Sequence, residues 1–266
     1  MDVTATNAVS GDSQERAILH DYEQRIGTGI RLPGIGAAAR WVVGLIPADR
    51  RPHRLVQLEA GLALFGVADA MLVMSGLGAT PWDVLHQGLS RHLHLAVGTM
   101  VIVVGTLVML LWIPLRQKPG FGTLSNVLVI GLAMNATMAW GPTPHALWLR
   151  WTVLLSGIFI NGIATGAYIG AGMGPGPRDG LMTGYSARGH SIRIVRTSIE
   201  VVVLTSGWLL GGTVGVGTAL FAVAIGPLAH RFIPLLAMKE RDESASPEVL
   251  EERASRSART LEHAAA

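Results

Sequence analysis

Six apolar stretches, most of them about 20 residues long, constrain this chain more than any other feature of its sequence. A helix of about 20 residues crosses the roughly 30 Å hydrocarbon core of a bilayer while bonding its own backbone groups. Half of the chain is hydrophobic and only 15% is charged, which is unlike a soluble domain. Strands of a membrane barrel would be about 10 residues long and would alternate in polarity. The fold class is therefore predicted as an all-α polytopic membrane helix bundle, with spans at Val56–Leu77, Leu95–Leu115, Gly122–Gly141, Ala146–Met173, Thr197–Gly212 and Thr218–Met238.

Segments between the spans predict the topology. Lys and Arg gather on every second flank of six spans, and cytoplasmic loops carry such an excess, so both termini are expected in the cytoplasm. The N-terminus has no signal-peptide pattern. The chain carries a net charge of +3, but its arginines form no basic groove with interleaved aromatics, so no nucleic-acid partner is expected. The expected divisions are a polar tail at 1–35, an interfacial segment at 36–55, membrane segments at 56–141 and 142–238, and a polar tail at 239–266.

A doubled segment indicates how the spans are arranged. "GATPWDVLHQGLS" at 78–90 returns as "GPGPRDGLMTGYS" at 174–186, and residues 58–94 match 154–190 at twelve of 37 positions. A second block, 120–131, matches 215–226 with the offset reduced by one. Each half then contains three spans, and because three is odd the halves enter from opposite sides. The sequence predicts two inverted three-helix repeats, the arrangement of many transporters.

The doubled segment predicts a short helix in each half. Pro81 and Pro177 suit the first turn, where a missing N–H costs nothing, and Asp83 and Asp179 complement the positive end of a helix. Two interpretations stay open. These Pro-x-Asp helices either turn the chain at the interface, or enter the membrane as half-helices whose ends face a shared pathway.

The sequence also resembles a known family. "GLGATPWDVLHQGLS", "PGFGTLSN", "GPRDGLM", Arg196 with Glu200, and "GGTVGVGTALFAVAIGPL" are similar to segments of the bacterial YczE/YyaS/YitT family of integral membrane proteins. The resemblance covers roughly 56–238 and implies a multi-span protein of the plasma membrane, of a kind often presumed to transport solutes. The YitT branch commonly carries a soluble C-terminal domain, whereas only residues 239–266 follow the last expected span here.

Asp69 is the most costly residue of the predicted spans. A carboxylate at the centre of a membrane helix costs about 2.5–3.5 kcal/mol on translocon scales, so we expect it to face an internal cavity and to bind a cation or carry a proton. A neutral, hydrogen-bonded structural acid is the alternative. Arg196 and Glu200 are four residues apart on one helix and can form either a structural ion pair or an anion contact. The expected substrate or ion pathway comprises Asp69, Asp83, Asp179, Arg178, Arg196, Glu200, Asn126, Asn135 and Asn161, although interhelical hydrogen bonds would also explain the three amides.

These features favour a transporter or channel for an unknown small solute or ion. A non-transporting accessory or binding protein is the alternative. No enzyme is expected, because paired inward acids and known nucleophile or zinc motifs are not evident. Neither a cofactor nor a metal is predicted, and the expected partner is the lipid bilayer. Glycines at 162, 166, 170 and 174 form a stripe that favours packing within the bundle, with a homo-oligomer as the alternative.

Overall fold

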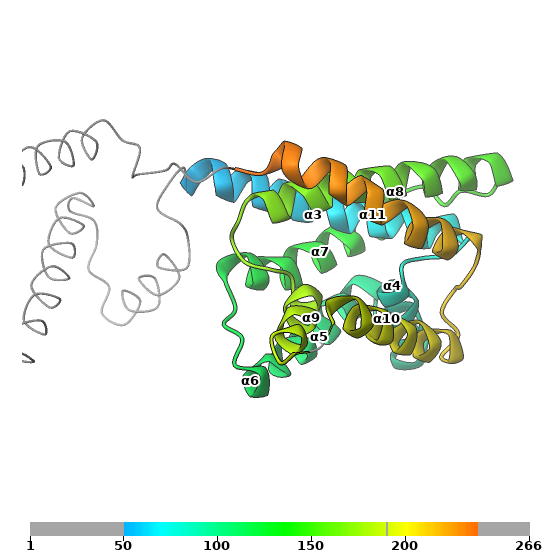
Figure 1. Cartoon of the computed structure of the whole chain (residues 1–266). Helices are drawn as coiled ribbons and strands as arrows, with labels where there is room; N and C mark the ends of the chain where they lie inside the picture. The colour runs from blue at the N-terminus through cyan, green and yellow to red at the C-terminus, as the bar shows by residue number, and fades with distance from the viewer. Residues whose placement is uncertain (1–50, 190, 239–266) are drawn as a thin grey trace, which may run out of the picture. The chain divides into compact units, whose positions relative to one another are not determined.

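The computed structural model describes residues 51–189 and 191–238 (Figure 1). Expectations for the tail at 1–35, for residues 36–50 and for the tail at 239–266 lie outside this part of the chain. All regular structure in the described part is helical, which confirms the predicted all-α class. The helices are α3 (Arg51–Ser75), α4 (Pro81–Leu93), α5 (Val97–Leu110), α6 (Trp112–Leu115), α7 (Phe121–Trp140), α8 (Leu147–Gly170), α9 (Pro177–Ser186), α10 (Ile192–Leu209) and α11 (Val216–Leu236).

Within residues 51–189 and 191–238, five helical stretches are long and apolar enough to cross a membrane. The sixth expected span falls on α10, whose 18 residues include three charged ones, Arg193, Arg196 and Glu200. By length and composition the described chain therefore has five helices that could span a membrane, and α10 is not among them because of its three charged residues. These five are Pro52–Ser75, Val97–Leu115, Phe121–Trp140, Leu147–Gly170 and Val216–Leu236. The first begins before Val56, so residues 52–55, expected in an interfacial segment, extend α3.

Both predicted short helices are present. α4 begins at Pro81 and α9 begins at Pro177, with an aspartate in the first turn of each. The Thr80 hydroxyl caps α4 by accepting a hydrogen bond from the Asp83 backbone N–H at 3.2 Å. Proline fixes the backbone dihedral of the first turn, and the cap satisfies one of its unpaired N–H groups. Local sequence thus explains where both helices start.

Helices α3 and α8 lie antiparallel against each other, and each supports the end of the other. Arg54, at the start of α3, donates from Nη1 to the Ala171 carbonyl just beyond α8, at 2.8 Å. Arg150, at the start of α8, donates from Nε to the Ser75 carbonyl at the end of α3, at 2.6 Å. A cation at a helix C-terminus stabilises the unpaired carbonyls there. Arg54 and Arg150 are 96 positions apart, so the two contacts are reciprocal.

Two further long helices cover this pair, α7 against α3 and α11 against α8. Glycines allow the close approach: a Cβ on Gly66 would meet the Ile130 carbonyl oxygen at 2.4 Å, and one on Gly166 would meet the Phe232 backbone at 2.7 Å. The stripe predicted on α8 is therefore used within the bundle. Gly162, Gly166 and Gly170 face α11, while Gly174 lies in the loop against Gly120.

Each of the loops that precede α4 and α9 accepts a hydrogen bond from the other half of the chain, where the halves are residues 56–141 and 142–238. The Gly122 N–H, at the start of α7, donates to the Met173 carbonyl at 2.8 Å, and the Gly217 N–H, at the start of α11, donates to the Leu77 carbonyl at 2.8 Å. Each loop turns through a glycine with positive φ, +125° at Gly78 and +109° at Gly174. A side chain is disfavoured in that backbone conformation. The start of one half's last helix is thus bonded to the loop before the other half's short helix.

The remaining helices form a second group, with α4 beside α10 and α5 beside α9 (Figure 1). The two halves of the chain differ in how their last two helices pack. In the first segment α5 packs against α7, whereas the corresponding helices of the second segment, α10 and α11, scarcely touch. Residues of both α10 and α11 line the cavity described next.

Candidate functional site: a polar cavity and a buried acid pair

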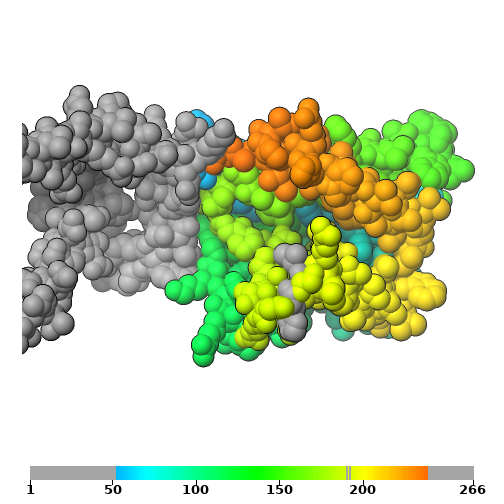
Figure 2. Space-filling view, in the orientation of Figure 1, coloured from blue at the N-terminus to red at the C-terminus, as the bar shows by residue number. Residues whose placement is uncertain are grey.

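A cavity of about 230 Å³ lies between the two groups of helices. Figure 2 shows the face hollowed between α11 in orange and α9 and α10 in yellow-green. Four apolar side chains of α11 form part of its wall: Phe221, Ile225, Ala229 and Ile233. The polar lining comes from the N-cap of α4 and from α7, α8, α9 and α10, and comprises Thr80, Asn126, Asn161, Thr165, Tyr168, Arg178, Asp179, Arg196 and Glu200. A concave, mostly apolar pocket with a few convergent polar groups is typical of a small-molecule site.

The first turns of both short helices open onto this cavity. Trp82 of α4 and Arg178 of α9 line it, and the Arg178 guanidinium carbon lies 5.0 Å from the centroid of the Trp82 ring. This is a cation–π contact. The two residues are 96 positions apart, so they occupy equivalent places in the doubled segment. The positive ends of two helices and the Arg178 guanidinium therefore converge on the same space, where the Asp179 carboxyl also lies.

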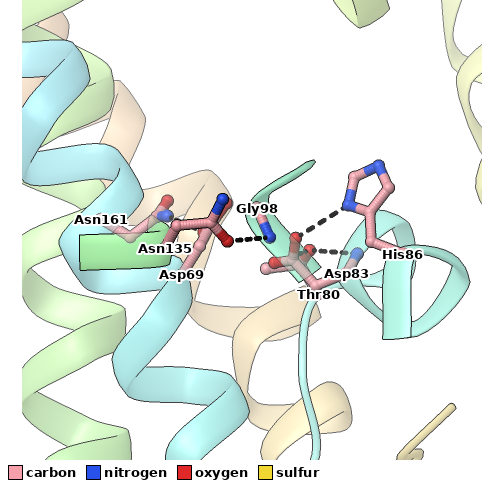
Figure 3. Close-up of polar contacts among 7 residues, drawn as sticks. All are labelled: Asp69, Thr80, Asp83, His86, Gly98, Asn135 and Asn161. Carbon is pink, nitrogen blue, oxygen red and sulfur yellow. Dashed lines mark hydrogen bonds and ion pairs between the residues drawn. The ribbon is translucent and has the colours of Figure 1, made fainter. Parts of the chain in front are cut away.

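Asp83 lies behind this surface in a network of its own. Its side chain is buried, with Oδ2 accepting from the Thr80 hydroxyl at 2.7 Å. Its Oδ1 lies 3.2 Å from Nδ1 of His86, which is also buried. Figure 3 shows Asp83 between these two partners. Both carboxyl oxygens thus have a hydrogen-bond donor within α4 or its cap.

Asp69 of α3 is fully buried, as the cost of exposing a carboxyl to hydrocarbon requires. Its Oδ1 accepts from the Asn161 amide of α8 at 2.8 Å (Figure 3). Within the described residues no donor reaches Asp69 Oδ2, and Asn161 Oδ1 also has no partner. The expectation that Asp69 faces the cavity is wrong in detail. Asn161 lines the cavity and Asp69 lies behind it.

The structure also brings Asp69 and Asp83 together. The side chains of Asp69 and Asp83 lie within hydrogen-bonding range of each other. The expectation that the protein has no paired inward acids is therefore wrong. The two residues come from different helices joined by a tight glycine loop, so their proximity depends on how α4 folds back on α3.

The other expected residues are divided between the cavity and structural contacts. Asp179 lines the cavity and accepts from the Tyr168 hydroxyl at 2.8 Å. Arg196 donates to Glu200 at 2.9 Å, and because the side chains are 58% and 35% exposed, the pair lies at the edge of the cavity.

The three amides have different surroundings. Asn126 and Asn161 line the cavity, whereas Asn135 does not. Asn135 accepts from the Gly98 N–H at 2.9 Å and donates to the Thr99 hydroxyl at 3.1 Å, which joins α7 to α5. Interhelical hydrogen bonding is therefore what the structure shows for Asn135.

Three residues of the site were not expected from the sequence: Trp82, His86 and Tyr168. Trp82 could have been found, since it occupies the repeat position of Arg178. His86 lies one turn after Asp83 on the same helix face, a spacing that permits the contact seen here. Tyr168 gives no such signal, because its partner Asp179 belongs to another helix. Within residues 51–189 and 191–238, no three His, Cys, Asp or Glu side chains gather as a metal site.

Comparison with known proteins places this architecture in a family. The model of DUF6198, a family of unknown function, matches residues 52–234. The chain belongs to this DUF6198 family. The matched region begins with α3 and ends within α11, so it contains every element of the cavity.

Curated relatives of this DUF6198 protein carry no assigned activity. An uncharacterised protein of Haemophilus influenzae is 42% identical over 177 residues, which cover 66% of this chain and 81% of the relative. The uncharacterised membrane protein YczE of Bacillus subtilis is 33% identical, with 66% and 83% covered. YyaS of the same organism is 25% identical, with 66% and 90% covered. The resemblance to YczE and YyaS is thus confirmed, and this is a multi-pass membrane protein. No solved structure matches the chain.

Proposed function

We propose that this protein is a transporter of a small solute in the plasma membrane, and that the cavity of about 230 Å³ is its substrate site. The observation that carries the proposal is where the cavity lies. The first turns of two short helices from different halves meet there, beside the Arg178 guanidinium and the buried amide of Asn161, whose Oδ1 has no hydrogen-bond donor within the described residues. Transporter sites typically lie at the interface of internal repeats, where the ends of short helices face the substrate.

The reciprocal contacts support an inverted-topology repeat. Arg54 and Arg150 stabilise each other's helix ends, and Gly122 and Gly217 bond each other's loops. Two copies related by a two-fold axis in the membrane plane would produce such pairs of contacts. Equivalent residues touch where they lie on the axis, as Trp82 and Arg178 do.

In this proposal α10 is the sixth crossing, which returns both termini to the cytoplasm. Its charged residues explain why composition alone does not select it. Arg196 and Glu200 form an ion pair at the edge of the cavity, and charged residues are tolerated in membrane proteins where they line a cavity.

The unequal packing of the two halves supports alternating access. The cavity is lined on one side by α7, which packs against α5, and on the other side by α10 and α11, which scarcely touch. If the halves exchanged these arrangements, α10 would close on α11 while α5 separated from α7. The cavity would then open on the opposite side through a rocking motion.

Access to the cavity tests the proposal, and the chain suits the test because it contains no cysteine. Single variants Thr165→Cys and Ala229→Cys place a thiol in the cavity lining. We expect both to react with a membrane-impermeant thiol reagent from at least one side, in right-side-out or inverted vesicles. Val104→Cys, buried between helices, is the control and should stay unlabelled. If neither cavity position reacts from either side, the accessory-protein alternative is favoured.

A further inference from the structure

We propose that Asp69 and Asp83 form one proton-binding site behind the substrate cavity, where the two buried carboxyls share a single proton. The inference deepens the proposed transport function by naming a proton as the coupling ion. Proton binding by the pair does not itself require transport, so the two can be tested separately.

The hydrogen bonds of the pair leave one position that a proton would fill. Asp83 uses both oxygens, toward Thr80 and His86, and Asp69 uses Oδ1 toward Asn161. Asp69 Oδ2 is fully buried without a donor. Two carboxylates cannot bond to each other, since both only accept. One proton between them converts the repulsion into a hydrogen bond and supplies the missing donor.

The charges around the pair also favour one proton. Arg178 from α9 is the cation that acts on both carboxyls. His86 from α4 is the other titratable group beside Asp83, and from α8 the Tyr168 hydroxyl is engaged with Asp179. α5 and α7 contain no titratable residue. Arg178 balances one negative charge, and like charges in a buried site do not both ionise.

The second copy of the segment shows that this network is not needed to begin a short helix. At the repeat positions of Thr80, Asp69 and His86 stand Gly176, Thr165 and Met182. α9 nevertheless starts at its proline with an aspartate in the first turn, as α4 does. The Thr80 cap, the histidine and the second acid are therefore not required to start a short helix, and they occur in one half of the protein only.

Asn161 connects the pair to the cavity. It donates to Asp69 on one side and lines the cavity on the other, with Oδ1 unpaired and buried. A ligand with an N–H or O–H donor would satisfy that oxygen. Rotation of this one side chain would open a path from Asp69 to the cavity, so ligand and proton can affect each other through a single amide.

Infrared spectroscopy of the purified full-length protein tests the proposal without a substrate. We expect the wild-type protein at neutral pH to show the C=O stretch of one protonated carboxyl per chain, shifting in D₂O. Asp69→Asn should remove this band, because Asp83 alone keeps three favourable partners, Thr80, His86 and Arg178. Asp179→Asn is the control and should leave the band in place.

Asp83→Asn provides a second measurement. Replacing the acceptor of the shared proton should displace or abolish the band. An unchanged band in Asp83→Asn, or its persistence in Asp69→Asn, would overturn the pairing. So would a wild-type protein without the band at neutral pH. Any of these results would leave the cavity labelling as it stands, so failure of the proton site and failure of the transport proposal are distinguishable.

Discussion

The close approach of α3 and α7 at Gly66 gives a prediction with a calculable magnitude. Gly66→Ala would place a methyl group 2.4 Å from the carbonyl oxygen of Ile130 and 2.9 Å from the Ala133 side chain. Atoms of this kind essentially never come within 3.0 Å, so α7 would have to retreat from α3 by about half an ångström or more. A helix carbonyl cannot rotate away as a side chain can, and α7 is held on its other face by α5.

The expected cost follows from two opposing terms. Overpacking a well-packed interior costs about 1–3 kcal/mol. Alanine in place of glycine stabilises the helix by about 1 kcal/mol, because its helix propensity is higher. We therefore expect Gly66→Ala to lower the free energy of unfolding by up to about 2 kcal/mol. The assay is thermal or SDS-induced unfolding of the purified protein in detergent.

Two matched glycines make the result decisive. Gly226→Ala, on α11, has no atom within 4 Å of the new methyl and should be neutral or slightly stabilising. Gly162→Ala, at the repeat position of Gly66, meets the Leu228 side chain at 2.6 Å. It should be intermediate, because α11 packs mainly on α8 and can move outward. Equal stability of Gly66→Ala and Gly226→Ala would show that α3 and α7 are not in the close contact described.

In a growth or uptake assay, Asp69→Asn should abolish proton-coupled uptake while the protein reaches the membrane in normal amount, since Asn keeps the shape of the side chain but carries no charge. Thr165→Val should have a milder effect in the same assay. Equal severity of the two variants would indicate a packing interface. Arg150→Ala removes a charged hydrogen bond to the end of α3 and should cost about 1.5–3 kcal/mol of stability, measured by the same unfolding assay; an unchanged midpoint would contradict the reciprocal capping. A cysteine at position 143 should react with an impermeant reagent from outside intact cells and one at position 260 should not. The opposite pattern would reverse the topology.

The doubled segment is evident from the amino-acid sequence itself. An offset of 96 positions relates Arg54 to Arg150 and Gly78 to Gly174, and their structural roles correspond. Such correspondence follows because duplicated sequences place the same side chain at the same point of the same helix. Two copies that pack against each other must then make their contacts in pairs.

Sequence alone also determined the helical class, five of the six expected spans and the starts of α4 and α9. These depend on local properties: the length of an apolar run, the fixed dihedral of proline and the affinity of a carboxylate for a helix N-terminus. Only the tertiary structure decided that Asn161 stands between Asp69 and the cavity, that Asp69 meets Asp83, and that Asn135 serves the contact between α5 and α7. Asp69 and Asn161 are 92 positions apart, and periodicity within a helix fixes which face a residue occupies but not which neighbour covers that face. That choice is made by the close approach of whole helices, which depends on all their glycines and side chains together.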